Sequence, residues 1–226
     1  MESKLGKIVI FGGGGFAREV HQLIEDINAV APTWHCMGFL DGDASRHGTL
    51  IHDLPVLGGV EWLESDACEG TSLVVAVGNP ALRCKIVGAL EREGRAHFAT
   101  LVHPRAWVGN RVTIGPGSIV CAGVLITTDV ALGRHVIVNI GSTIGHDAMV
   151  GDFVTIAPTV NVSGAVTLGE GADLGTGSTL IQGRQVGAWS IVGAGSVVVK
   201  DIEANVTAVG SPTRVIKSRN AGWQLE

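Results

Sequence analysis

Apolar residues recur every six positions through the second half of the chain. From Ala106 to Asp201 the sequence divides without a gap into 16 hexads, and the third position of each is Val, Ile or Leu. The first position is Val, Ala or Ser in 15 of the 16, with Arg184 as the exception. Because 46% of the chain is hydrophobic, chance would give such a run of third positions roughly four times in a million. The period therefore reflects one repeated structural unit.

The hexad predicts a short strand followed by a corner. Side chains alternate between the two faces of a strand, so the first and third positions would point inward and the second outward. Glycine occupies the fourth position in nine hexads, where a side chain would obstruct the bend. Three strands and corners close a triangular coil of about 18 residues, and stacked coils bury one continuous core. We therefore expect a parallel β-helix of about five coils, whose handedness the period does not set.

The first hundred residues follow a different pattern, in which apolar runs alternate with amphipathic segments. The runs typical of buried strands lie at 7–11, 36–40 and 73–77. Helices are predicted at 16–29 and at 80–92, the second after Asn79, a good N-cap residue, and Pro80. Strand–helix alternation indicates a small parallel α/β sheet. We therefore expect a Rossmann-like βαβ domain at 1–102, then the β-helix domain with a short C-terminal tail at 103–226.

Composition and charge narrow the classes of partner. The 226 residues carry a formal net charge of −5, which gives no electrostatic reason to expect nucleic acid or an anionic membrane. No apolar run approaches the ~20 residues that span a bilayer, and nothing resembles a signal peptide, so membrane insertion is not expected. The cysteines lack C-x-x-C pairing and are interpreted as free thiols of a cytoplasmic protein, at positions Cys36, Cys68, Cys84 and Cys121.

A glycine-rich turn joins the first predicted strand to the first helix. Gly12, Gly14 and Ala17 form a G-x-G-x-x-A pattern, which can place phosphates against N–H groups at a helix N-terminus. Asp41 ends the next strand, where an acid could bind a ribose hydroxyl. The alternative is a turn that serves packing alone. A dinucleotide is less expected than a nucleotide, because ~100 residues hold about half of a doubly wound domain.

His146 and Asp147 stand together at a predicted corner of the β-helix. Histidine occurs at the fifth hexad position once in the 16 hexads, and by itself it could be a solvated turn residue. One coil later lies Gly164, about 4.8 Å away in a stacked helix. A neutral imidazole beside a free N–H suits acyl transfer, because the ring accepts a proton while the N–H stabilises an oxyanion. Asp147 would orient the ring.

Metal and thiol chemistry are not expected at this corner. A zinc site in a β-helix needs histidines that converge from neighbouring coils, but His103, His135 and His146 fall in different hexad positions. Cys121 has Asn139 rather than a base one coil away, so a thiol nucleophile is not predicted.

Five stretches together resemble the bacterial sialic acid O-acetyltransferase and nucleotide-linked 4-amino-sugar N-acetyltransferase family of hexapeptide-repeat acyltransferases. They are IVIFGGGGFAREV, GFLDGD, VAVGNPALR, STIGHDAMVGDFVTIAPTV and AVGSPTRVI. The resemblance implies a left-handed β-helix, a homotrimer, a nucleotide-linked sugar held by the front domain, and acetyl-CoA held along the β-helix between subunits. No metal cofactor is expected, given the spacing of the histidines.

The resemblance also assigns roles to residues. His146 would be the catalytic base and Asp147 its acidic partner. The substrate-binding residues implied are Gly12, Gly13, Gly14, Gly15, Phe16, Asp41, Gly78, Asn79 and Arg83. The acetyl-CoA-binding residues implied are Thr155, Gly164, Gly193, Ala194 and Pro212. Relatives often carry histidine at the position of Phe16, and many have a second aspartate at Gly42, so the nucleotide base and the sugar stay open. Many relatives also carry a second histidine near the acetyl group at the position of Thr155, so the role of Thr155 stays open.

The function predicted from these residues is acetyl-CoA-dependent N-acetylation of the 4-amino group of a nucleotide-linked amino-deoxy sugar, by direct transfer. Three alternatives remain. They are O-acetylation of a sialic acid-type sugar, a non-catalytic nucleotide-sugar-binding scaffold, and a nucleotide-linked dehydrogenase.

Overall fold

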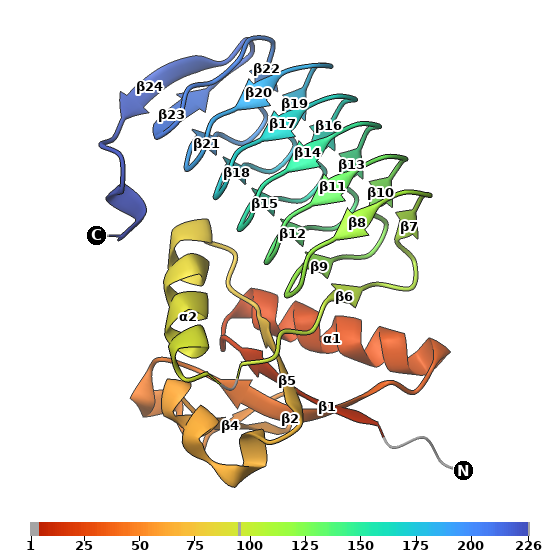
Figure 1. Ribbon diagram of the computed structural model, residues 1–226, viewed down its shortest axis with the longest axis vertical. Helices are drawn as coiled ribbons and strands as arrows, with labels where there is room; N and C mark the ends of the chain where they lie inside the picture. Colours follow the sequence, from red (N-terminus) through yellow and green to blue (C-terminus); the bar gives the residue numbers. More distant parts are fainter. Residues whose placement is uncertain (1–4, 95, 226) are drawn as a thin grey trace.

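The computed structural model describes residues 5–94 and 96–225, which form an α/β domain followed by a β-helix (Figure 1). The sheet of the α/β domain has the strand order β3-β4-β2-β1-β5, with β3 antiparallel to β4 and the other pairs parallel. Its strands are β1 Gly6–Phe11, β2 Trp34–Leu40, β3 Leu50–Ile51, β4 Leu54–Gly58 and β5 Thr71–Val75. Its helices are α1 Gly15–Val30, α2 Pro80–Arg92, η1 Ala44–Arg46, η2 Val60–Glu64 and η3 Asp66–Cys68.

The predicted strands and helices of this domain form because their apolar residues meet in two clusters that include residues from the two faces of the sheet. Ile8, Val9 and Ile10 are 0% exposed, which is typical of a central parallel strand covered on both faces. Val20 and Ile24 of α1 pack in the cluster that holds Ile8 and Ile10, whereas α2 packs in the cluster that holds Val9. The side chain of Asn79 accepts a hydrogen bond from the Leu82 N–H and so caps α2, as the sequence predicted.

The β-helix confirms the hexad prediction, since each short strand from β7 to β22 holds the second and third residues of one hexad, and β6 precedes the first hexad. The strands are β6 Leu101–Val102, β7 Trp107–Val108, β8 Thr113–Ile114, β9 Ile119–Val120, β10 Leu125–Ile126, β11 Ala131–Leu132, β12 Ile137–Val138, β13 Thr143–Ile144, β14 Met149–Val150, β15 Thr155–Ile156, β16 Asn161–Val162, β17 Thr167–Leu168, β18 Asp173–Leu174, β19 Thr179–Leu180, β20 Gln185–Val186, β21 Ile191–Val192 and β22 Val197–Val198. A C-terminal hairpin, β23 Val206–Val209 and β24 Arg214–Ser218, and η4 Trp223–Leu225 complete the chain.

These strands make three parallel sheets that form the faces of a left-handed prism. The β13 sheet has the order β22-β19-β16-β13-β10-β7, and the β14 sheet has the order β20-β17-β14-β11-β8. The third, which we call the domain-facing sheet, runs from β24 at one end to β6 at the other. Thr143 pairs with Asn161 and Thr155 with Asp173, so the register advances by 18 residues per coil as predicted.

The glycines at the fourth hexad position are required for a reason other than the predicted bend. A Cβ on Gly145 would lie 2.5 Å from the backbone nitrogen of Gly164, and one on Gly151 would lie 2.8 Å from that of Glu170. Glycine there lets the next coil stack closely. The left-handed turn falls instead at the sixth position, where Asp147 has a φ of 58°.

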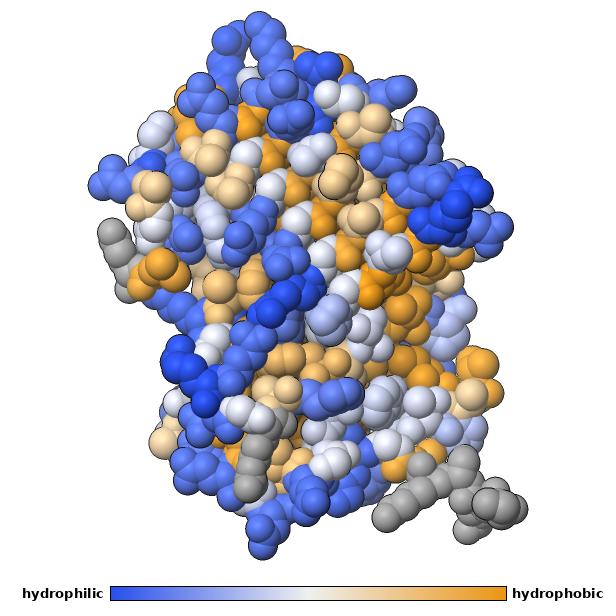
Figure 2. All heavy atoms as spheres, viewed as in Figure 1, coloured by the Kyte–Doolittle hydropathy of each residue, from blue (hydrophilic) through white to orange (hydrophobic). Residues whose placement is uncertain are grey.

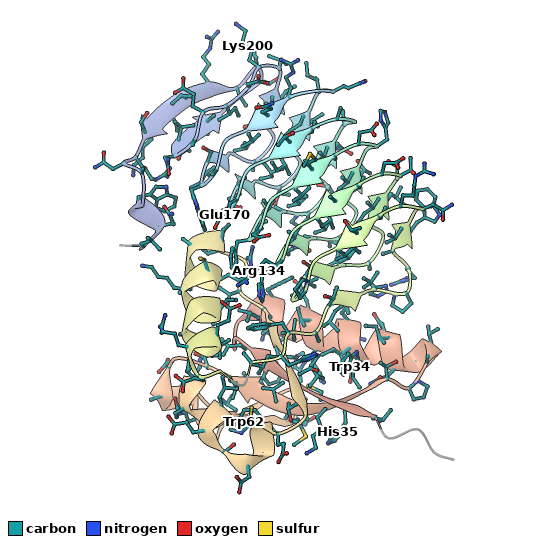
Figure 3. All side chains as sticks on the ribbon, viewed as in Figure 1. Trp34, His35, Trp62, Arg134, Glu170 and Lys200 are labelled. Atoms are coloured by element: carbon teal, nitrogen blue, oxygen red, sulfur yellow. The ribbon has the colours of Figure 1, made fainter. Side chains whose placement is uncertain are left out.

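The domain-facing sheet closes onto the α/β domain, so the two domains share core residues. Ile119 and Ile137 belong to the same apolar cluster as α1, while Phe153 and Trp189 pack with β5 and α2. Arg134 and Glu170 lie on coils beside α2 (Figure 3), and an Arg134 nitrogen lies 2.7 Å from a Glu91 oxygen. The β-helix therefore has one covered face and two faces that remain available in a single chain. Within the described residues no helix has the length and hydrophobicity to cross a membrane.

Candidate active site

His146 projects from the corner between β13 and β14, away from the α/β domain. Its Nδ1 lies 2.7 Å from Asp147 Oδ2, and just over half of the ring surface is exposed. Asp147 is fixed in turn, because its N–H donates to the Thr128 carbonyl at 3.2 Å. When Nδ1–H donates to the carboxylate, the neutral ring keeps its lone pair on Nε2. The corner therefore presents an oriented proton acceptor to solvent.

Gly164 lies directly against the ring, one coil further along. A Cβ on Gly164 would be 2.5 Å from His146 Nε2, so a side chain there would displace the imidazole. The sequence predicted an open shelf at Gly164, but the ring itself covers that glycine. Among the described residues the Gly164 N–H donates to no backbone oxygen. Nε2 and an uncommitted N–H donor thus lie at the same corner.

An ion pair on the preceding coils extends this corner. Arg111 Nη2 donates to Asp129 Oδ2 at 2.9 Å, and this hydrogen bonding lowers the pKa of Asp129 to about 2. Residues 111, 129 and 147 are spaced by 18, so they stack in one column. Sequence reasoning missed the pair, although the same 18-residue spacing that linked His146 to Gly164 could have found it.

The glycine turn of the α/β domain forms a separate pocket of about 620 Å³, which most of the predicted substrate-binding residues line. Its lining includes the residues Gly12, Gly13, Gly14, Gly15, Phe16, Asp41 and Gly78. Gly12 is required by its backbone conformation, and a side chain on Gly13 would displace the Asp41 carboxylate. Gly12 has a φ of 123°, and a Cβ on Gly13 would lie 2.4 Å from Asp41 Oδ2. No side chain caps α1 at Gly14, so its first N–H groups are available to an anionic ligand.

Two cations near this pocket were not predicted. Arg46 Nη1 donates to Asp41 Oδ2 at 3.1 Å, which fixes the carboxylate expected to bind a ribose. Lys85 of α2 lines the pocket together with Leu82 and Ile86. Their i, i+3, i+4 spacing from Leu82 marks one face of the helix, so the sequence did contain a signal for Lys85.

Arg83 corrects one sequence prediction, because it does not line the pocket. The side chain is 0% exposed, and its donors reach the carbonyls of Val77, Gly78, His135 and Phe153. Asn79 also departs from the prediction. Its side chain caps α2, and the residue lines a small separate cavity beside Trp223.

The predicted acetyl-CoA-binding residues do not gather within one chain. Thr155 is 8% exposed and lies on the domain-facing sheet, where its hydroxyl donates to the Gly78 carbonyl at 2.7 Å. Gly193 and Ala194 follow β21 at the corner next to that sheet, whereas Gly164 follows β16 at the His146 corner. Pro212 follows a cis peptide bond in the C-terminal hairpin. Within one chain these residues are thus distributed over different corners and sheets of the β-helix.

The pocket and the His146 corner also belong to different sides of the chain. The α/β domain packs on the domain-facing sheet, and His146 lies at the corner where the other two sheets meet. Within one chain the pocket and His146 therefore lie on opposite sides of the β-helix.

The other histidines and the cysteines lie elsewhere. His103 Nε2 is 2.8 Å from Asp26 Oδ2. His135 stacks on Phe153, and its burial lowers its pKa to about 3. In the part of the chain that the structure describes, no three His, Cys, Asp or Glu side chains come together as a metal site would need. Burial raises the pKa of the Cys121 thiol to about 12, which disfavours a thiolate.

Comparison with known proteins agrees with this architecture. The sequence profile of the PglD N-terminal domain matches residues 7–90. A crystal structure of a histidine-to-asparagine mutant of perosamine N-acetyltransferase from Caulobacter crescentus, in complex with CoA and GDP-perosamine, is 34% identical. It superposes with a TM-score of 0.84 over 95% of this chain and 99% of that one. The acetyltransferase domain of PglB from Neisseria gonorrhoeae is 32% identical, with a TM-score of 0.83 over 93% of this chain and 100% of that one.

A curated relative gives a shorter match. GDP-perosamine N-acetyltransferase from Escherichia coli O157:H7 is 29% identical over 147 residues, and the match spans 65% of each protein. The likeness to the Caulobacter protein, by contrast, extends over nearly the whole of both chains and includes the α/β domain and the β-helix. The chain belongs to the sialic acid O-acetyltransferase and nucleotide-linked 4-amino-sugar N-acetyltransferase family, whose members are hexapeptide-repeat, acetyl-CoA-dependent acetyltransferases.

Proposed function

We propose that the protein transfers the acetyl group of acetyl-CoA to the 4-amino group of a nucleotide-linked amino-deoxy sugar. The observation that carries the proposal is the His146–Asp147 pair, held at 2.7 Å with Nε2 against Gly164. The His146 ring is a proton acceptor, and the Gly164 N–H beside it can donate a hydrogen bond to an oxyanion. The relatives from Caulobacter and Escherichia are named as N-acetyltransferases of perosamine or GDP-perosamine, which supports an amine as the acceptor.

The proposed reaction is a direct transfer in a ternary complex. The sugar amine attacks the thioester carbonyl, and His146 Nε2 takes the proton that the nitrogen loses. The Gly164 N–H donates to the oxyanion of the tetrahedral intermediate, and Asp147 stabilises the imidazolium. Collapse breaks the C–S bond, and the CoA thiolate leaves and takes the proton from the imidazolium. The products are the N-acetylated sugar and CoA.

We propose that the pocket of the α/β domain holds the nucleotide part of the acceptor. The uncapped N-terminus of α1 suits a diphosphate, and Lys85 adds a positive charge to the same lining. Asp41, oriented by Arg46, is placed to accept hydrogen bonds from ribose hydroxyls.

We propose a homotrimer, in which the pocket of one subunit faces His146 of its neighbour. The separation of the two half-sites supports this, and so does the exposure of large apolar side chains on the two uncovered sheets. Trp107 is 56% exposed, Leu125 46% and Met149 61%. Figure 2 shows hydrophobic side chains along the coils above the α/β domain. Burial of these side chains between subunits would remove them from water.

The acetyl-CoA site would then lie between two subunits. Gly164 would come from one, and Gly193, Ala194 and Pro212 from the other. Thr155 takes no part in our proposal for this site, since its hydroxyl is engaged with Gly78. We also propose a cytoplasmic location, where acetyl-CoA and nucleotide-linked sugars are made and thiols stay reduced.

The test is thiol release from acetyl-CoA with a panel of UDP-, GDP- and dTDP-linked 4-amino-6-deoxy sugars. We expect at least one of them to be acetylated, with the product heavier by one acetyl group in mass spectrometry. Acetylation of the matched 4-hydroxy sugars at a comparable rate would favour an O-acetyltransferase instead. Nucleotide-sugar binding without any thiol release would favour the scaffold.

A further inference from the structure

A buried network ties one wall of the nucleotide pocket to the β-helix. Its centre is Arg83, whose Nη1 donates to the Val77 carbonyl at 2.6 Å and to the Gly78 carbonyl at 2.9 Å. Its Nε donates to the His135 carbonyl at 3.0 Å, and its Nη2 to the Phe153 carbonyl at 2.7 Å. One side chain therefore holds the β5–α2 loop against two successive coils.

Thr155 completes the network from the β-helix side. Its hydroxyl accepts from Arg83 Nη2 at 2.9 Å and donates to the Gly78 carbonyl at 2.7 Å. A threonine hydroxyl can do both at once, because it has one donor and two acceptor positions. The Gly78 carbonyl therefore receives two hydrogen bonds, one from each residue.

Gly78 is the point at which this network reaches the ligand site. Gly78 lines the pocket, and a Cβ built on it would meet nothing within 4 Å. Its carbonyl therefore points into the protein while its α-carbon faces open space. Any movement of the loop away from the β-helix would change the shape of the pocket directly.

We propose that Thr155 and Arg83 are positioning residues for nucleotide-sugar binding, because they fix the Val77–Gly78 wall of the pocket from the β-helix. This inference rests on the proposed function of the pocket. It assigns Thr155 to the nucleotide side of the reaction, although the sequence placed it with acetyl-CoA.

The charge of the network explains why its two polar side chains act together. Burial lowers the pKa of the Arg83 guanidinium to about 9, and the nearby Asp173 carboxylate opposes that shift. Arg83 thus remains a cation at neutral pH, surrounded by carbonyl oxygens that solvate it in place of water. Removal of the Thr155 hydroxyl leaves Arg83 Nη2 with fewer acceptors and the Gly78 carbonyl with one donor fewer.

The decisive comparison is Thr155→Val against Thr155→Ser. Valine keeps the shape but lacks the hydroxyl, while serine keeps the hydroxyl. Loss of a buried hydrogen bond at the pocket wall should raise the Kd for the nucleotide about 5–30-fold. We expect this rise with Thr155→Val and less than about threefold with Thr155→Ser. Calorimetry with GDP-perosamine, GDP, UDP and dTDP measures it without requiring turnover.

Two further readouts and a second variant separate a positioning role from a general loss of stability. KM for the nucleotide sugar should rise with Thr155→Val, while KM for acetyl-CoA stays within about twofold, because Gly164 lies at another corner. Amide hydrogen exchange should speed up at 76–82 and not in the coils around residue 146. Arg83→Lys keeps a charge but cannot reach all these carbonyls, so it should act in the same direction.

Each outcome bears on a defined claim. Equal nucleotide affinity in wild type and Thr155→Val would overturn this inference and leave the proposed function standing. An equal rise in both KM values would also overturn it, because the network would then be only structural. If the wild-type protein binds none of the four nucleotide probes, the proposed function itself fails.

Discussion

The proposed catalytic role of the His146 corner is tested most sharply by Gly164→Ala. The added Cβ would lie 2.5 Å from His146 Nε2, 2.6 Å from Cε1 and 3.0 Å from Cδ2, whereas ordinary van der Waals contact begins near 3.4 Å. The ring must therefore shift by about 1 Å or leave the glycine altogether. A misplacement of about 1 Å at a reacting centre costs roughly 10²-fold in rate. We expect kcat for thiol release to fall about 100-fold.

The backbone of Gly164 does not need glycine, since the positive φ at this turn belongs to Ala165. The effect of alanine should therefore arise from the ring alone. Gly88→Ala is the matched control, because its Cβ would meet only Arg92 Nη1 at 3.8 Å. It should keep full activity and gain about 0.5–1 kcal/mol of stability, as expected for glycine replaced within a helix. A folded Gly164→Ala enzyme with turnover within threefold of wild type would refute the placement of His146 over Gly164.

Four more predictions follow from other parts of the structure. His146→Asn should lower kcat by ~10²–10⁴ with little change in acetyl-CoA affinity. Asp147→Asn should lower kcat less, because it removes the orientation of the ring and not the proton acceptor. Equal losses for both variants in steady-state kinetics would contradict this. Lys85→Met should raise KM for the nucleotide sugar about tenfold at low salt and less at high salt; a salt-independent change would contradict a phosphate contact. Burial lowers the pKa of His135 to about 3 in the folded state. Between that value and the ordinary histidine pKa of about 6.5, the unfolded chain therefore binds more protons than the folded one. Stability should thus fall by about 1.4 kcal/mol per pH unit between about pH 6 and 4, and His135→Asn should remove this part of the slope in denaturation curves. Deletion of 1–99 should expose the apolar domain-facing sheet and cause aggregation in light scattering; a stable, soluble β-helix would show that this face needs no cover.

The sequence could predict the β-helix and the placement of His146 beside Gly164 because both depend on a local period. The sixfold phase sets which residues are strands, and the 18-residue coil places Gly164 beside His146. The same arithmetic applies to Arg111 and Asp129, whose pairing the period also implies. These parts of the structure need no information about contacts between distant segments.

The network around Arg83 could not be predicted from the sequence in the same way. Arg83 lies close to Gly78 in the sequence, so a contact with the ligand was the simplest interpretation. Its burial arises because α2 meets coils that lie 52 and 70 residues further on. Thr155 occupies an outward hexad position, which is exposed or half-buried on the uncovered sheets but buried at Thr155, where the α/β domain packs. Which sheet is covered depends on the docking of two domains, and no local pattern records it.

The central claim is that the pocket of one subunit serves His146 of another, and mixed assemblies test it most directly. His146→Asn removes the base, and Gly78→Leu fills the pocket, because the Cβ of residue 78 faces open space. Each variant alone should be nearly inactive. Co-expressed in equal amounts and purified through two tags, they should form sites that combine an intact pocket with an intact His146 from a neighbour. In every trimer that contains both variants, one of the three sites combines an intact pocket with an intact base, so roughly a third of wild-type activity should return. Mixed assemblies as inactive as either parent would contradict the account.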